Sequence, residues 1–321
     1  MNRAVLMTSV DPFVALLGYH FSKNYIDEID KLYILCGHPW KELGEFVGDY
    51  LADDPKVVYK YLPQITPLDK MYNTLLDMSH ERNVMFLEDD GFILKKGAVG
   101  HYFNELESGK YNIIGSPRAS CTPGIWNQAK LKFKLNYEGA GDKGPNFWPC
   151  FLYTNRQLLE DTDRYFGDQR WEPHTYMHPL DWTTEEEEAG DTFVWMSLQM
   201  RALTGRILEI PQNKTIGNAY KKGDYIGDVG KHLDWIHAGS LSSGIEGFFD
   251  GNSYLRLKNT QKEELESRAA WWNIAMHLKP YDGVKGLKKD YVDGWRNFVQ
   301  DLGLDTGNIN KKISLFSTFL V

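Results

Sequence analysis

The sequence predicts an α/β protein built on a doubly wound sheet flanked by helices. Four short apolar runs typical of buried strands alternate with segments of helical spacing in the first 90 residues. The runs are Ala4 to Met7, Leu32 to Leu35, Val57 to Leu62 and Val84 to Leu87. Such alternation is typical of a sheet whose parallel strands are joined by helices. The fourth run is the most informative, because three carboxylates follow it directly.

The segments between these runs predict three helices. Pro12 to Phe21 has apolar residues at helical spacing, and residues 39 to 51 read as a second helix. A third helix is expected to run to about Ser79. Its start is marked by Thr66 as a candidate N-cap and by Pro67 at the first helical position.

The pattern is looser after residue 90. We expect strands at Tyr111 to Gly115 and Arg206 to Ile210, and a helix at Thr192 to Leu203. Residues 119 to 150 are rich in Gly, Pro, Lys and aromatic residues and predict long loops. Two further helices are expected within 256 to 301. The chain is therefore predicted to have a first domain over 1–245 and a helical C-terminal appendage over 246–321.

Composition narrows the classes of function. A chain of 321 residues can bury a full core. Its formal net charge of −8 argues against a general nucleic-acid binder, since such proteins carry a basic field. The three cysteines form no closely spaced framework and predict free thiols in a reducing compartment. The sequence lacks a signal-peptide pattern and an apolar run of membrane-spanning length, so we expect a cytoplasmic protein.

The run from Val84 to Asp90 predicts a metal site. Glu88, Asp89 and Asp90 follow a strand that is apolar enough to be buried on both faces. Adjacent carboxylates at the end of a buried strand repel one another and lose hydration, so they need a partner. A divalent cation is the usual partner, and open α/β sheets bind ligands at the carboxyl ends of their strands.

The order of these features resembles the GT-A class of glycosyltransferases. The shared order is strand–helix repeats, an acidic motif ending the fourth strand, an acid-rich helix start about 100 residues later, and a late histidine beside glycines. The resemblance covers residues 1 to 245 and implies a GT-A-like mixed sheet. In the family, a D-x-D motif holds a divalent metal and the sugar nucleotide. Here D-x-D itself is absent, and Glu88 and Asp90 occupy its outer positions.

The resemblance implies a metal centre and a donor site. The implied metal ligands are Asp90, Glu88 and His237, and the implied metal is Mn²⁺ or Mg²⁺. An imidazole added to carboxylates suits manganese better than calcium. The donor would be a nucleoside diphosphate sugar, with UDP favoured. Its implied contacts are Thr8, Ser9, Asp11, Lys70, Glu88, Asp89 and Gly239.

An acidic segment is the candidate source of a catalytic base. In inverting members of the class, one acid in this region deprotonates the acceptor hydroxyl. Asp191 is the first candidate and Glu188 the second. As an alternative, Asp191 caps the helix that follows it, and the glutamates form a solvated charged run.

Other functions stay open at this point. A nucleotidyltransferase on a related sheet would also use clustered acids, although it would need a Gly-rich basic loop after the first strand. A non-catalytic carbohydrate-binding module would use Trp126, Trp148 and Trp182 as stacking surfaces. The acceptor is expected to be a glycan or small molecule. Four lysines leave a modified base in DNA as an alternative acceptor: Lys130, Lys132, Lys134 and Lys143.

Overall fold

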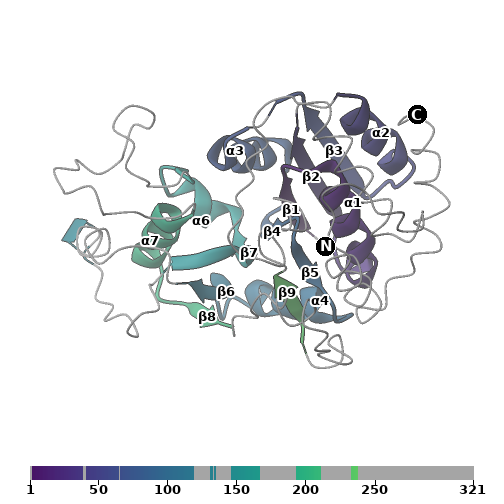
Figure 1. Ribbon diagram of the computed structural model, residues 1–321. Coiled ribbons are helices and arrows are strands. Elements are labelled where there is room, and N and C mark those ends of the chain that lie inside the picture. Colours follow the sequence, from purple (N-terminus) through teal and green to yellow (C-terminus); the bar gives the residue numbers. More distant parts are fainter. Residues whose placement is uncertain are drawn as a thin grey trace, which may run out of the picture.

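The computed structural model describes residues 2–38, 41–64, 66–118, 131–132, 134, 146–166, 193–210 and 233–237. Its centre is a seven-stranded sheet with the strand order β3-β2-β1-β4-β7-β6-β8 (Figure 1). The strands are β1 (Arg3–Ser9), β2 (Lys31–Gly37), β3 (Val57–Leu62), β4 (Asn83–Glu88), β6 (Ile113–Arg118), β7 (Asn146–Asn155) and β8 (Ile207–Glu209). A second sheet pairs β5 (Gly91–Ile93) with β9 (Trp235–His237).

The main sheet is mixed. Strand β1 pairs in parallel with both β2 and β4, and β2 pairs in parallel with β3. Strand β7 is antiparallel to both of its neighbours, β4 and β6, and β6 is parallel to β8. The predicted doubly wound mixed sheet is therefore confirmed. The carboxyl ends of six strands lie at one edge, where β7 enters with its amino end.

Helices cover both faces of the sheet. They are α1 (Pro12–Phe21), α2 (Lys41–Leu51), α3 (Leu68–Met78), α4 (Ala98–Glu107), α6 (Arg156–Glu160) and α7 (Val194–Leu203); two 3₁₀ turns, η1 (Ser22–Asn24) and η2 (Ile26–Glu28), follow α1. Alternate residues of β1 belong to different cores. Val5 and Met7 pack in the core that includes α1, α2 and α4, while Ala4 and Leu6 pack in the core that includes α3, α6 and α7. This alternation produces three layers.

Strand β7 corrects the sequence prediction. Residues 119 to 150 were expected to be loops, but Asn146 to Cys150 form the first half of β7. This segment contains Pro149 and shows no alternation of apolar and polar residues, so it lacks the usual strand pattern. Its pairing with β4 depends on contacts that are distant in sequence, such as Phe86 with Leu152.

Shorter elements were also not predicted. Helix α4 was missed, and β5 and β9 have three residues each, too few to display a strand period. Helix α3 begins one residue later than expected, with Pro67 as its N-cap. The Thr66 hydroxyl donates to the carbonyl of Gln64 at 3.3 Å, so it does not cap the helix. The predicted appendage over 246–321 lies outside the described residues.

Aromatic stacking fixes the small sheet against helix α1 and against the large sheet. The Phe92 ring of β5 stacks on Phe21 of α1 with a centroid distance of 4.5 Å. The Trp235 ring of β9 stacks on Phe151 of β7 with a centroid distance of 5.0 Å and an interplanar angle of 8°. All four side chains are buried. His237 lies two residues after Trp235 in β9, so the stacking of Trp235 on Phe151 helps to fix the position of His237.

Close packing of α2 on β3 gives a prediction for stability. An alanine Cβ at Gly44 would lie 2.2 Å from two ring carbons of Tyr61, whose hydroxyl donates to the His38 carbonyl. Gly44→Ala gains about 1 kcal/mol of helix propensity. Displacing the ring outweighs this gain, so we expect a net loss of about 1–2 kcal/mol in the free energy of unfolding.

Gly48→Ala on the same helix is the matched control. Its Cβ would meet Tyr59 at 3.4 Å, an ordinary contact, so we expect no loss and a gain of up to about 1 kcal/mol. Urea denaturation of both variants measures the difference. Equal stability of the two variants would contradict the packing of α2 on Tyr61.

Candidate metal centre

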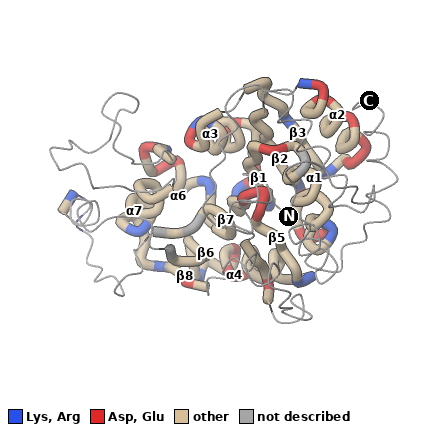
Figure 2. Tube along the Cα trace, viewed as in Figure 1, with Lys and Arg blue, Asp and Glu red and all other residues tan. Residues whose placement is uncertain are grey.

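The acidic triplet lies where the strand order of the sheet reverses. Strand β1 has β2 on one side and β4 on the other, and Thr8 at the end of β1 is paired with Glu88 at the end of β4. The amide of Asp89 donates to the Thr8 carbonyl at 3.2 Å. Open α/β sheets bind ligands at such a switch point, outside the carboxyl ends of their strands. Figure 2 shows acidic residues in this central region between β1 and β5.

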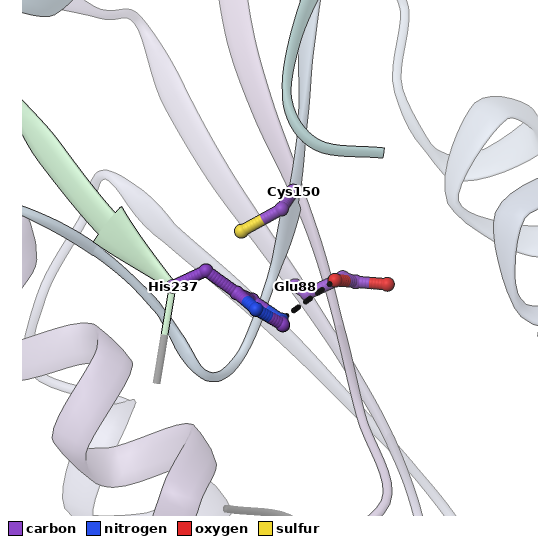
Figure 3. Close-up of side chains that lie close together, drawn as sticks. All are labelled: Glu88, Cys150 and His237. Atoms are coloured by element: carbon purple, nitrogen blue, oxygen red, sulfur yellow. Dashed lines mark ion pairs between the residues drawn. The ribbon is translucent and has the colours of Figure 1, made fainter. Parts of the chain in front are cut away.

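His237 completes a cluster with two of the three acids. Strand β9 pairs with β5 so that His237 lies opposite Gly91, the residue that follows the triplet. Its Nε2 lies 3.1 Å from Asp90 Oδ1 and 3.3 Å from Glu88 Oε2. Figure 3 shows the ion pair with Glu88. Asp90 and His237 are buried, and the Glu88 side chain is 20% exposed. The structure thus brings together the three residues predicted to bind metal.

Cys150 is the member of this cluster that the sequence analysis missed as a site residue. Ligand atoms of Glu88, Cys150 and His237 all lie within 4.8 Å of one another. Figure 3 shows the sulfur directed toward the imidazole. Three different strands, β4, β7 and β9, supply these residues. Cys150 could not be assigned to the site from the sequence because the strand that contains it, β7, was not predicted.

The donor atoms in this cluster fit a divalent cation. Carboxylate oxygens, an imidazole nitrogen and a thiol sulfur are all metal ligands in proteins. They converge from separate strands at the edge of the sheet where ligands bind. No other group of three such side chains with converging ligand atoms occurs among the described residues.

Asp89 lies in a different environment from its two neighbours. Its Oδ2 is 2.5 Å from Ser9 Oγ, and Ser9 Oγ is also 2.8 Å from the carbonyl of Asp11. Burial, followed by the charge of Asp90, raises the pKa of Asp89 well above its usual range. The Ser9 hydroxyl donates to Asp89 Oδ2, and this hydrogen bond opposes the rise of the Asp89 pKa. Asp89 therefore ties β4 to β1 within the core.

Asp11 begins helix α1. Its Oδ1 accepts from the amide of Val14 at 3.4 Å, and its carbonyl accepts from the amide of Ala15 at 2.9 Å. These contacts are those of an N-cap residue. Thr8, Ser9 and Asp11, all predicted donor contacts, are buried at the end of β1 beside the metal cluster. Donor binding by them remains a prediction, and their structural contacts account for their positions.

Tyr72 of α3 is a second residue that the sequence did not single out. Its side chain is fully buried, and its hydroxyl makes no hydrogen bond of good geometry. Burial, and then the charge of Glu88, raise the pKa of Tyr72 well above its usual range; the neighbouring Thr8 side chain acts in the opposite direction. A buried polar atom without a hydrogen bond beside a cluster of metal-binding side chains would gain a partner if a further polar group were bound there.

The remaining predicted site residues are not joined to this cluster. Lys70 is exposed in the first turn of α3, where its carbonyl accepts from the Thr74 hydroxyl at 2.7 Å. Gly239, Glu188 and Asp191 lie outside the described residues, as do Trp126 and Trp182. Of the three predicted free thiols, Cys36 and Cys150 are buried and form no disulfide within the described part of the chain, and Cys121 lies outside the described residues.

Comparisons with known proteins give likenesses to solved structures. No family model matches the chain, and no curated protein sequence matches it. The mannosyltransferase PcManGT from Pyrobaculum calidifontis, solved with GDP-Man and Mn²⁺, aligns with 98% of this chain and 73% of its own, at 9% identity and a TM-score of 0.45. S. aureus TarS 1–349 aligns with 94% of this chain and 80% of its own, at 11% identity and a TM-score of 0.41.

A third similar structure is apo WbbM, a bifunctional glycosyltransferase, at 8% identity and a TM-score of 0.44. The alignment covers 80% of this chain and 50% of WbbM, so the chain spans about half the length of that protein. A separate structure of TarS contains UDP-GlcNAc. Among the described residues of this chain, none of the helices has the length and hydropathy needed to cross a membrane.

The charge state of His237 gives a pH prediction. Burial alone would lower its pKa, but Asp90 and Glu88 outweigh burial and raise the pKa to about 9. A group whose pKa rises on folding contributes stability that is complete below its unfolded pKa of about 6.5. That contribution is lost as pH rises toward 9, and it amounts to about 3 kcal/mol. We therefore expect the metal-free protein to become less stable between pH 6.5 and 9.

Thermal unfolding in the presence of a chelator, at several pH values, measures this effect. His237→Gln cannot titrate, so its melting temperature should change less over the same interval. Saturating divalent metal should reverse the trend in the unmodified protein, because metal binding requires the neutral imidazole. A pH dependence shared equally by both proteins would exclude His237 as its source.

Proposed function

We propose that this protein is a metal-dependent glycosyltransferase that moves a sugar from a nucleoside diphosphate sugar to an acceptor hydroxyl. The observation that supports this most strongly is the convergence of Glu88, Asp90 and His237 at the switch point between β1 and β4. Sugar transfer from such a donor expels a diphosphate, whose charge must be neutralised. A divalent cation bound by these residues supplies that neutralisation as a Lewis acid.

The chain's own residues have separate tasks in this proposal. Asp90, Glu88 and His237 would hold the cation. Glu88 is the most exposed of the three, so it also faces the donor. Thr8 and Ser9 end β1 beside the cluster, and the nucleoside would lie over this end of the sheet.

The finer assignments follow from the same site and from the sequence resemblance. We propose UDP as the nucleoside diphosphate and manganese as the metal, since a mixed set of carboxylate and imidazole ligands suits manganese. We propose a glycan or a small molecule as the acceptor. Cys36 and Cys150 are buried and are not joined in a disulfide, which suits a reducing compartment, so we propose a cytoplasmic location.

A panel of sugar nucleotides tests the class of enzyme. Each compound is added with Mn²⁺ in a thermal-shift assay, and the stabilising ones are then tested for metal-dependent hydrolysis or transfer. A nucleoside diphosphate sugar should raise the melting temperature only when metal is present. Release of pyrophosphate from a nucleoside triphosphate would instead identify a nucleotidyltransferase. Carbohydrate binding without any turnover would identify a binding module.

Asp90→Asn should abolish metal-dependent donor binding and transfer. The change removes a charged ligand while keeping the shape of the side chain, and it relieves repulsion within the triplet. The change also removes the charge that pairs with protonated His237, so we expect the metal-free protein to lose part of its stability near neutral pH. Asp53→Asn, an exposed acid on the connection between α2 and β3, is the control and should be silent. Calorimetry that finds unchanged donor binding in Asp90→Asn would refute the metal assignment.

Asp191→Asn tests the proposed base, which lies outside the described residues. Asparagine caps a helix nearly as well as aspartate, so this change removes basicity but little capping ability. If Asp191 is the base, transfer should fall by roughly 10²–10⁴-fold, with donor affinity and melting temperature nearly unchanged. Glu188→Gln is the comparison variant. Loss of transfer only in Glu188→Gln would move the assignment to Glu188.

A further inference from the structure

Cys150 extends the candidate metal centre with a sulfur ligand. The preceding proposal uses two carboxylates and an imidazole, as expected from the sequence. The thiol of Cys150 lies on the same cluster, with its sulfur within 4.8 Å of ligand atoms of both Glu88 and His237. Cys150 is fully buried, and its strand enters the site antiparallel to β4. A cysteine in a wholly apolar core would lack such neighbours.

The separations of His237 Nε2 from the two carboxylates are close to those between ligands of a tetrahedral site. With Zn–S near 2.3 Å and Zn–N or Zn–O near 2.0–2.1 Å, ligand atoms lie about 3.3–3.6 Å apart. His237 Nε2 is already 3.1 Å from Asp90 Oδ1 and 3.3 Å from Glu88 Oε2. The sulfur is within 4.8 Å, so it needs to approach by only about 1 Å to reach the distances of bound zinc.

Neighbouring residues define the position of the sulfur. A Cβ on Gly91 would lie 2.4 Å from Cys150 Sγ, so the absence of a side chain at Gly91 lets the thiol sit beside the acidic turn. On another side, the buried hydroxyl of Tyr72 lacks a hydrogen-bond partner of good geometry. A water or substrate oxygen on the metal would supply that partner. This second, independent observation also indicates a ligand at the cluster.

We propose that Cys150 is a thiolate ligand of this centre, which therefore also binds the thiophilic divalent cations zinc and cobalt, beside the manganese that its carboxylates and imidazole suit. The proposal rests on the metal site of the proposed glycosyltransferase but concerns its metal chemistry alone. Binding breaks the S–H bond, releases its proton to solvent and forms a metal–sulfur bond, with no change in oxidation state. Sulfur ligands select zinc over the hard cations that oxygen ligands favour.

Cobalt spectroscopy tests the metal–sulfur bond without any need for activity. Co²⁺ added to the reduced, metal-free protein should give near-ultraviolet sulfur-to-cobalt charge-transfer absorption with a one-to-one end point. The absorption should disappear in Cys150→Ser and in Cys150→Ala. It should persist in Cys36→Ser and in Cys121→Ser, which are the matched controls. Circular dichroism of each metal-free variant establishes that it is folded. Because Cys150→Ala adds no buried hydroxyl, it keeps the test valid if serine unfolds the protein.

The affinities of the Cys150→Ala variant for zinc and for manganese provide a second test. In Cys150→Ala, zinc affinity should fall by roughly 100-fold or more, because loss even of an outer partner of a ligand costs about 10–100-fold. Manganese affinity should change by a few-fold at most. Absence of the charge-transfer band in the unmodified protein, or its persistence in Cys150→Ala, overturns the proposal. A cysteine-dependent band in a protein that turns over no sugar nucleotide would sink the proposed function and leave the sulfur ligand standing.

Discussion

The burial of three adjacent carboxylates at the end of β4 is the constraint on which the site depends. Each ionised carboxylate loses hydration there, and neighbouring ones repel. The fold meets this cost in two ways. Asp89 turns into the core, where burial raises its pKa and its carboxyl accepts a hydrogen bond from the Ser9 hydroxyl. Glu88 and Asp90 turn to His237, whose raised pKa keeps the imidazole charged in the absence of metal.

Asp89 therefore has a different role from its neighbours Glu88 and Asp90. The contact between Asp89 and Ser9 joins β4 to β1, so it stabilises the sheet at the point where its strand order reverses. The ion pairs of His237 join the end of β4 to β9, and they lie where the proposed cation would bind. A proton on the imidazole and a metal ion are therefore competing ways to neutralise the same two carboxylates.

The local part of this arrangement was predictable from sequence. Strands β1, β2 and β4 contain continuous apolar runs, and β3 is rich in Val and Tyr around Lys60. The helices between them show helical spacing, so the order of these elements and the acidic end of β4 followed from local patterns. His237 was also predicted, but from a resemblance to a family rather than from its own surroundings. Its pairing opposite Gly91 joins segments that no local pattern connects.

Strand β7 could not be predicted from local sequence patterns. Asn146 to Asn155 contains a proline and no clear alternation, and its identity as a strand depends on β4 and β6 already being present on either side. Cys150 therefore could not be placed beside Glu88 before the sheet was known. The same reasoning applies to Tyr72, which reads as an ordinary apolar position of α3 and whose hydroxyl acquires meaning only from its neighbours in the folded protein.

The pairing of β5 with β9 has a consequence for how the protein is made. Closing this pair brings together segments separated by roughly 140 residues, which adds a chain-entropy cost that local pairs such as β1 and β2 do not bear. Synthesis begins at the N-terminus, so β1 to β4 leave the ribosome well before His237 does. The nascent chain thus carries an uncompensated acidic turn, and docking of β9 is a late step in folding. Amide protons of this short pair should accordingly exchange with solvent sooner than those of β1, which lies between two partners.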